Sequence, residues 1–191
     1  MRDITLNWVN ILIPYTKDYN LRLTATDISK ETKTPQQTVS RILNRLEELN
    51  LINYIIQGKN KLFYFDLKKS TSKTIINLIE LKKTLDFQLN RKKEAIIINE
   101  LLNHCESIIL FGSYAIGEQT KDSDLDILII NGDEIQIKKM KKKYPIQINE
   151  HHSTIKKFEE LIKQKNNLSI EIKNKHILFN HTSKITNIFM E

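Results

Sequence analysis

Glycine, proline and cysteine are all scarce in this sequence of 191 residues, which contains four, three and one of them respectively. The single cysteine, Cys105, cannot form an internal disulfide, which excludes the class of small secreted domains held together by disulfides. The sequence contains neither a secretory signal nor an apolar run of about 18 residues. We therefore expect a cytoplasmic protein that does not enter a membrane.

The composition is that of an ordinary folded protein, with 40% hydrophobic and 28% charged residues. The length suits one domain or two small ones of about 70 to 100 residues each, so both organisations stay open at this point. The formal net charge is +7, and the excess is spread along the chain rather than gathered in a basic tail. This charge is compatible with a polyanionic partner and equally with a solvated, lysine-rich surface.

Residues 1–67 have the pattern of three helices followed by a β-hairpin. We expect a first helix from Ile4 to Tyr15 and a short second helix capped by Thr24. A third helix is expected with Thr34 as its cap and Pro35 at its first position, because proline is favoured there. Two β-prone runs, 51–56 and 61–66, then predict the hairpin.

This order of elements resembles that of winged helix-turn-helix transcription regulators. The resemblance covers about residues 4–67 and implies that the third helix enters the major groove of double-stranded DNA. The expected DNA contacts are the polar side chains of that helix and two lysines of the hairpin: Gln36, Gln37, Thr38, Ser40, Arg41, Arg45, Lys59 and Lys61. The alternative is a domain of the same fold that contacts only other proteins.

Residues 68–94 are expected to form a helical connector, as part of a helical pattern that runs from about Thr71 to Leu102. Arg91-Lys92-Lys93 marks a candidate joint in this pattern. We expect one apolar side on the helix, made of Ile75, Leu78, Ile79, Leu85 and Leu89. That side predicts a contact between two copies of the chain, which makes a homodimer a candidate assembly.

Residues 95–191 alternate apolar strands with helices, which predicts a domain with a mixed sheet. One strand is expected at 107–111 and another from Asp124 to Ile130. Because side chains alternate between the two faces of a strand, Asp124 and Asp126 point the same way. Two neighbouring carboxylates repel each other, and a divalent cation such as Mg²⁺ or Mn²⁺ relieves that repulsion.

Gly112-Ser113 follows the first of these strands, where the chain turns into a helix. Free backbone N–H groups at such a turn can hold phosphate oxygens, glycine lets the backbone approach them closely, and Ser113 adds a hydroxyl. A phosphate holder and a metal holder are thus supplied by consecutive elements. Transfer of a nucleoside monophosphate from a triphosphate needs both.

These residues resemble the minimal nucleotidyltransferases of the DNA polymerase β superfamily, whose signature is Gly-Ser, ten residues and Asp-x-Asp. The spacing here is the same, and the resemblance covers about residues 95–180. It implies that Gly112 and Ser113 bind the nucleotide, that Asp124 and Asp126 act as metal ligands and catalytic residues, and that ATP with Mg²⁺ is the expected donor. The expected fold is α+β: a winged helix-turn-helix (1–67), a helical connector (68–94) and a mixed-sheet nucleotidyltransferase domain (95–191).

The family generally uses a third acidic residue on a later strand. We expect that strand at 145–149, where the matching position holds Gln147, a neutral amide. Glu150 is the only acid nearby. Strand alternation places Glu150 on the face opposite Gln147, so it is a candidate catalytic carboxylate only if the strand ends or bulges there.

Two functions follow from these features. The first is a Mg²⁺-dependent nucleotidyltransferase with an unknown acceptor, for which the resemblance implies a partner toxin as one candidate, joined to a DNA-binding domain. The second is a DNA-binding transcription regulator whose nucleotidyltransferase-like domain is catalytically degenerate and senses a nucleotide. The missing third carboxylate decides whether the chain is an enzyme.

Overall fold

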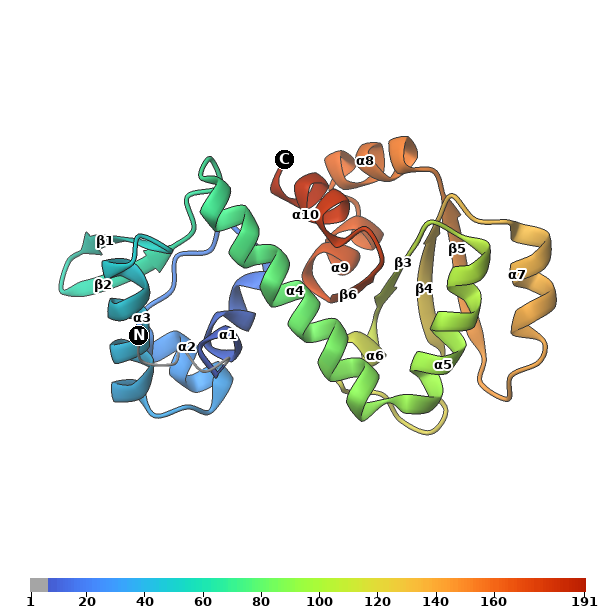
Figure 1. The fold of residues 1–191 in the computed structure, drawn as a ribbon, viewed down its shortest axis with the longest axis horizontal. Coiled ribbons are helices and arrows are strands. Elements are labelled where there is room, and N and C mark those ends of the chain that lie inside the picture. The colour runs from blue at the N-terminus through green and yellow to red at the C-terminus, as the bar shows by residue number, and fades with distance from the viewer. Residues whose placement is uncertain (1–6) are drawn as a thin grey trace. The chain divides into compact units, whose positions relative to one another are not determined.

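The computed structural model describes residues 7–191, which form two compact units, one ending at Lys82 and the other spanning Lys83–Phe189. Helices and strands follow one another in both units, and the larger sheet is mixed, which is the predicted α+β fold (Figure 1). None of the helices in the described residues has the length and apolar character needed to cross a bilayer.

The first unit begins with short helical elements: α1 (Asn7–Leu12), the 3-10 turn η1 (Ile13–Lys17), α2 (Ala25–Thr32) and α3 (Gln36–Glu48). The predicted first helix therefore continues past Pro14, which lies in the first turn of η1, where a missing backbone N–H breaks no hydrogen bond. Ile4, where we expected this helix to begin, lies outside the described residues.

The predicted N-cap of α2 is confirmed, whereas the predicted N-cap of α3 is wrong. Thr24 caps α2 as predicted, since its Oγ1 accepts a hydrogen bond from the backbone N–H of Asp27. The predicted Thr34 cap of α3 is wrong, because the Thr34 hydroxyl donates back to the carbonyl of Thr32 at 3.3 Å. Pro35 is the N-cap instead, and the helix begins one residue later than expected.

The hairpin consists of β1 (Asn53–Gln57) and β2 (Asn60–Tyr64), paired antiparallel. Leu23 adds an isolated bridge to Phe63, which ties the hairpin to the chain just before α2. The Tyr15 hydroxyl donates to the carbonyl of Phe63 at 2.9 Å, and both of these side chains are buried. The hairpin is therefore a fixed part of the helical unit.

Two helices follow the hairpin, α4 (Ser70–Asn90) and α5 (Lys92–Leu101), and they break at Arg91 as the sequence predicted. The apolar side that we expected on α4 is buried over only part of the helix. Ile75 and Ile79 are buried, whereas Leu85 and Leu89 are exposed. At 100° per residue, Ile75 and Leu89 are only about 40° apart around the helix, so the predicted residues share one side and differ in what packs against each turn.

The second unit is built on a four-stranded sheet in the order β5-β4-β3-β6. Its strands are β3 (Ser107–Phe111), β4 (Leu125–Ile130), β5 (Ile148–Ser153) and β6 (His176–Phe179). β4 and β5 are parallel, whereas β3 is antiparallel to both of its neighbours. The end of β3 and the starts of β4 and β5 consequently meet at one edge of the sheet (Figure 1).

Helices pack around this sheet: α6 (Ser113–Ile116), α7 (Glu134–Lys141), α8 (Ile155–Gln164), α9 (Asn167–Asn174) and α10 (Thr182–Met190). One buried cluster joins Ile98 of α5 and Ile137 of α7 to alternate residues of β3 and β4. The sequence had not predicted α10, although Ile185, Ile188 and Phe189 bury an apolar side of it.

The predicted strand at 145–149 is three residues too early. The chain first pairs with β4 through the Gln147 carbonyl, which accepts from the Leu125 N–H at 2.9 Å. Regular pairing then runs from Ile148 to Ser153. This polar segment forms a strand because its backbone pairs with the buried strand β4. The sequence pattern could not show that pairing.

The capping box of α2 generates a prediction about stability. Asp27 accepts hydrogen bonds from the Thr24 hydroxyl and from its backbone N–H, and these bonds lower the pKa of the Asp27 carboxyl. A group whose pKa is lower in the folded state stabilises the fold above its usual pKa, and this contribution disappears as the pH falls through the lowered value.

We expect Thr24→Ala to reduce the free energy of unfolding of the first unit by about 1 kcal/mol at neutral pH. Urea denaturation followed by circular dichroism measures this change. The difference between wild type and variant should begin to shrink below about pH 4, near the usual pKa that Asp27 has in the unfolded chain, and should be lost once the pH is below the lowered value. A difference that stays constant with pH would contradict the role of the Asp27 carboxylate.

Candidate functional site

Two aspartates lie at the start of β4, on the edge of the sheet described above. Asp124 directly precedes the strand, Asp126 is its second residue, and both are half-buried. The side-chain amide of Asn149 donates to Asp124 Oδ2 at 3.0 Å and to Asp126 Oδ1 at 3.1 Å. A single amide can reach both carboxylates only because they point to the same side, as strand alternation predicted.

Asn149 occupies this position because of the register between two parallel strands. Its Cα is the partner of Asp126 in the pairing of β4 with β5. Gln147, just before β5, also donates its amide to Asp124 Oδ2, at 3.1 Å. Two neutral amides therefore face the acidic pair, and the residue that spans both carboxylates is Asn149, not the Gln147 that we expected at the third position.

Glu150 does not join the acidic pair. It is the register partner of Ile127, so its side chain lies on the opposite face of the sheet from Asp126 and Asn149. There it forms an ion pair with Lys141 of α7, and its side chain is only 9% exposed. The strand neither ends nor bulges at Glu150, so the candidate third carboxylate is corrected to a structural partner of Lys141.

The ion pair also fixes the charge state of Glu150. Burial raises the pKa of this carboxyl, but the hydrogen bond from Lys141, a backbone hydrogen bond and the Lys141 charge together lower it below its usual value. Glu150 is therefore ionised at neutral pH and already neutralised by a lysine. The lowered pKa makes Glu150 a weaker base, and its place on the opposite face of the sheet keeps it away from an acceptor at the acidic pair.

Gly112 brings the backbone at the end of β3 against Asp126. The preceding residue, Phe111, is the register partner of Asp126, and Gly112 has φ of 70° and ψ of −151°. A Cβ at Gly112 would lie 2.6 Å from Asp126 Oδ2. Only glycine fits this conformation and this contact, so the Asp126 carboxylate and the turn form one compact site.

Ser113 begins α6 next to this contact and is half-buried. Its hydroxyl makes no hydrogen bond to any part of the chain that the structure describes, so it is available to a ligand. α6 is a single turn of four residues. A helix this short has only a small dipole, so individual N–H groups and the Ser113 hydroxyl are the relevant phosphate donors.

The arrangement is suited to one divalent cation. Two carboxylates can neutralise the charge of one Mg²⁺, and the amide of Asn149 can turn its oxygen toward a cation as well as donate to carboxylates. Within residues 7–191, no group of three or more histidine, cysteine, aspartate and glutamate side chains is placed to hold a metal. The third acidic position is thus filled by an amide.

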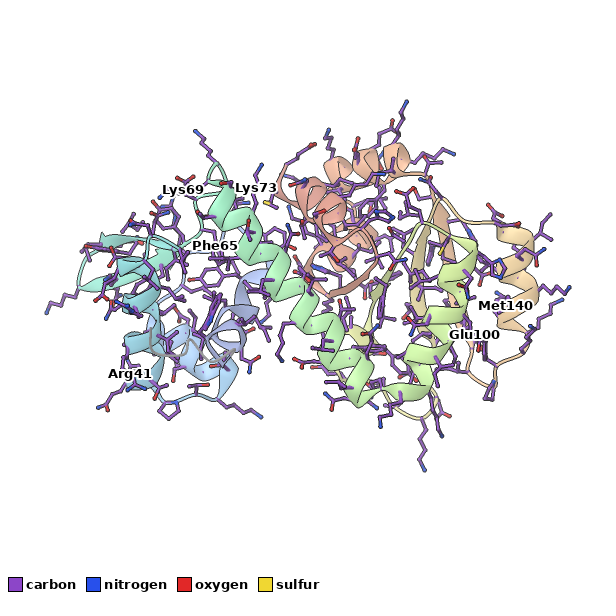
Figure 2. The ribbon with its side chains drawn as sticks, viewed as in Figure 1. Arg41, Phe65, Lys69, Lys73, Glu100 and Met140 are labelled. Atoms are coloured by element: carbon purple, nitrogen blue, oxygen red, sulfur yellow. The ribbon has the colours of Figure 1, made fainter. Side chains whose placement is uncertain are left out.

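The first unit carries the predicted DNA contacts. Gln37, Arg41 and Arg45 lie on successive turns of α3 and are exposed, and Figure 2 shows Arg41 projecting outward from this helix. Lys59 is exposed at the tip of the hairpin. These four side chains form an accessible polar surface, in which Arg45 also pairs with Glu48 at 2.9 Å, while Val39, Leu43 and Leu46 of α3 are buried.

The other predicted contacts are held by the protein itself or are less accessible. The Gln36 amide donates to Thr26 Oγ1 at 2.9 Å, and Thr38 and Ser40 are half-buried. Lys61 donates to Asn44 Oδ1 at 2.9 Å, and its ammonium lies 3.9 Å from the centre of the Tyr54 ring. We therefore expect Lys61 to stabilise the packing of the hairpin against α3 rather than to contact a DNA phosphate.

Residues 92–179 match the family model described as a nucleotidyltransferase domain. The chain contains a nucleotidyltransferase domain. Residues 15–55 match the model of the MarR family, so a winged helix domain of that family precedes the nucleotidyltransferase domain. No curated protein and no solved structure matches the chain significantly.

The matched segments contain the features built up above. The nucleotidyltransferase domain includes Gly112, Ser113 and the acidic pair with Asn149, and the winged helix domain includes the whole of α3. The structure has the predicted turn at Gly112-Ser113 after a strand and the predicted shared side of the two aspartates, because both features depend on local spacing. It missed Asn149, because the start of β5 depends on pairing with β4.

Gly112→Ala generates a test of the site geometry. The added methyl group would displace Asp126, so we expect the dissociation constant for Mg²⁺-ATP, measured by calorimetry, to rise by about tenfold or more. Gly117→Ala is the matched control, because Gly117 has a similar φ of 75° but a Cβ there would meet no atom within 4 Å. Equal losses in both variants would show that backbone strain, not the contact with Asp126, is responsible.

Proposed function

We propose that the nucleotidyltransferase domain binds a Mg²⁺-loaded nucleoside triphosphate, with ATP as the first candidate, and that this binding regulates DNA recognition by the winged helix domain. The observation that carries the proposal is the amide of Asn149 between Asp124 and Asp126. With an amide in this position, two carboxylates can bind a metal, and no third carboxylate faces the site to accept a proton. The site thus supports ligand binding better than rapid turnover.

The ligand would be held by groups already in place. Asp124 and Asp126 would hold Mg²⁺, while Ser113 and the backbone at Gly112 would hold phosphate oxygens. When bound, Mg²⁺ supplies positive charge that offsets the charge of the triphosphate. Asn149 bonds to one oxygen of each carboxylate, so the other oxygens could bind the cation, or the amide could turn its own oxygen toward it.

The regulation can be tested by gel shifts on DNA taken from upstream of the protein's own gene. We expect Mg²⁺-ATP to change the DNA affinity of the wild type and to have no effect on the variant with Asp124→Asn and Asp126→Asn. Both proteins should bind DNA equally without nucleotide. Binding of the wild type that is indifferent to Mg²⁺-ATP would remove the sensing role.

The predicted DNA contact of α3 can be tested with two further variants in the same gel-shift assay. Arg41→Ala removes an exposed cation from α3, and we expect it to weaken DNA binding by about 1–3 kcal/mol if the guanidinium contacts a base edge. Lys17→Ala removes one charge from the same domain, where Lys17 pairs with Glu31. A loss that is the same for Arg41→Ala and Lys17→Ala would point to net charge alone.

A second candidate function is transfer of a nucleoside monophosphate to an acceptor, for which a partner toxin remains one proposal. The close contact between Gly112 and Asp126 favours this function, because it places the backbone that would hold phosphate next to a carboxylate that would hold the metal. In this case water or an acceptor hydroxyl would attack without help from a protein carboxylate. The expected turnover is slow, because loss of a positioned base commonly costs about 10²–10⁴-fold in rate.

Asn149→Asp separates these two functions. Restoring a carboxylate beside Asp124 and Asp126 should raise the rate of pyrophosphate release from ATP by about 10²-fold. Asn149→Ala is the control, since it removes the amide without adding an acid. Labelled ATP with a cell extract, or with the product of a neighbouring toxin gene, would identify an acceptor. A wild type that turns over as fast as Asn149→Asp would establish an enzyme and reject the degenerate site.

A further inference from the structure

The loop between α6 and β4 joins the two halves of the candidate site. Residues 117–124 connect α6, which begins with Ser113 on the phosphate side, to Asp124 on the metal side. This segment consists of turns and irregular backbone. The position of Asp124 relative to Ser113 therefore depends on how the loop is held against the rest of the domain.

Local hydrogen bonds shape the two ends of this loop. The Glu118 N–H donates to the Ser113 carbonyl at 3.0 Å, which closes α6. Near the other end, the Thr120 N–H donates to Ser123 Oγ at 2.8 Å, and the Ser123 N–H donates to the Thr120 carbonyl at 3.3 Å. These bonds join residues that are close in sequence, so they define turns without attaching the middle of the loop to the domain.

Arg91 attaches the middle of the loop through Gln119. Figure 1 shows the joint between α4 and α5, where Arg91 lies, at the same end of the sheet as this loop. With its amide oxygen oriented toward Arg91, Gln119 accepts hydrogen bonds from Nη1 at 2.7 Å, from Nε at 3.3 Å and from Nη2. Gln119 is half-buried, whereas its neighbours Glu118 and Thr120 are exposed. Hydrogen bonds from a charged donor are stronger than those between neutral groups, so this contact is suited to anchoring the loop.

Arg91 is itself held in place by the helices that meet at the joint. Its backbone N–H donates to the Phe87 carbonyl at 2.7 Å, and its carbonyl accepts from the Ala95 N–H at 2.9 Å. Phe87 and Ala95 are both buried in the core of the domain. The guanidinium also lies close to α6: burial and the Glu94 charge raise the pKa of Tyr114, and the Arg91 charge lowers it. Arg91 is therefore an anchored side chain beside both α6 and the loop.

We propose that Arg91 is a positioning residue of the nucleotide site: its hydrogen bonds to Gln119 hold the loop so that Asp124 keeps its place opposite the phosphate-binding turn. This inference rests on the proposed binding of a Mg²⁺-loaded nucleotide. Arg91 acts through the loop and does not touch the ligand. Without this anchor the loop has to be ordered when the ligand binds, and that cost lowers the affinity.

Two measurements on the full-length protein test the proposal. In hydrogen exchange without any ligand, we expect Arg91→Ala and Gln119→Ala each to speed amide exchange in residues 118–123 by about tenfold. In calorimetry, each variant should raise the dissociation constant for Mg²⁺-ATP by about 5- to 10-fold, and the double variant should lose no more than either single one.

The choice of variants separates anchoring from simple charge. Gln119→Ala keeps the Arg91 charge, so a loss in this variant cannot come from removing a cation near the phosphates. Gln119→Glu should retain the affinity and the slow exchange, because a carboxylate accepts hydrogen bonds from a guanidinium at least as well as an amide does. Lys93→Ala is the matched control: Lys93 is exposed at the same joint, and its removal should change neither measurement.

Circular dichroism should show the same helix content in all of these proteins. If Arg91→Ala fails to fold, Gln119→Ala and Gln119→Glu still test the contact, because Gln119 lies in a loop. Unchanged exchange in Gln119→Ala would overturn the proposal, as would losses of affinity that add in the double variant. A wild type that does not bind Mg²⁺-ATP would overturn the proposed function, and the exchange measurement would then decide by itself whether Arg91 holds the loop.

Discussion

The hydrogen bonds from Asn149 hold together two carboxylates that would otherwise repel each other at the start of β4. Both aspartates project from one strand, and the amide comes from the neighbouring parallel strand, so the contact depends on the register of that pair. The donated N–H groups supply part of the positive potential that a cation would supply. The acidic pair is consequently stabilised in the fold by groups of the chain itself.

Neighbouring residues of β5 have different roles on the two faces of the sheet. Asn149 faces the aspartates, whereas Glu150, the next residue, points to the other face and is neutralised by Lys141. The acid in this segment is therefore part of the packing between β5 and α7, and the neutral amide is part of the ligand site. A shift of one residue in the pairing would exchange these roles, so the function of the domain depends on β-sheet register.

The sequence predicted those features that depend on nearby residues. The joint at Arg91, the cap at Thr24 and the alternation of Asp124 and Asp126 all follow from local spacing, and the structure has each of them. It could not predict features that depend on pairing or burial between distant segments. The start of β5 depends on β4, and which turns of α4 are buried depends on the elements that pack against them.

A single-base codon change separates asparagine from aspartate, and hydrolysis of the asparagine amide, which adds water and releases ammonia, makes the same conversion within a finished protein. Position 149 is therefore one mutation, or one hydrolysis, from presenting three acids at the sheet edge instead of two. The exchange requires no change in the backbone, because the pairing of β4 with β5 already places this side chain against both aspartates.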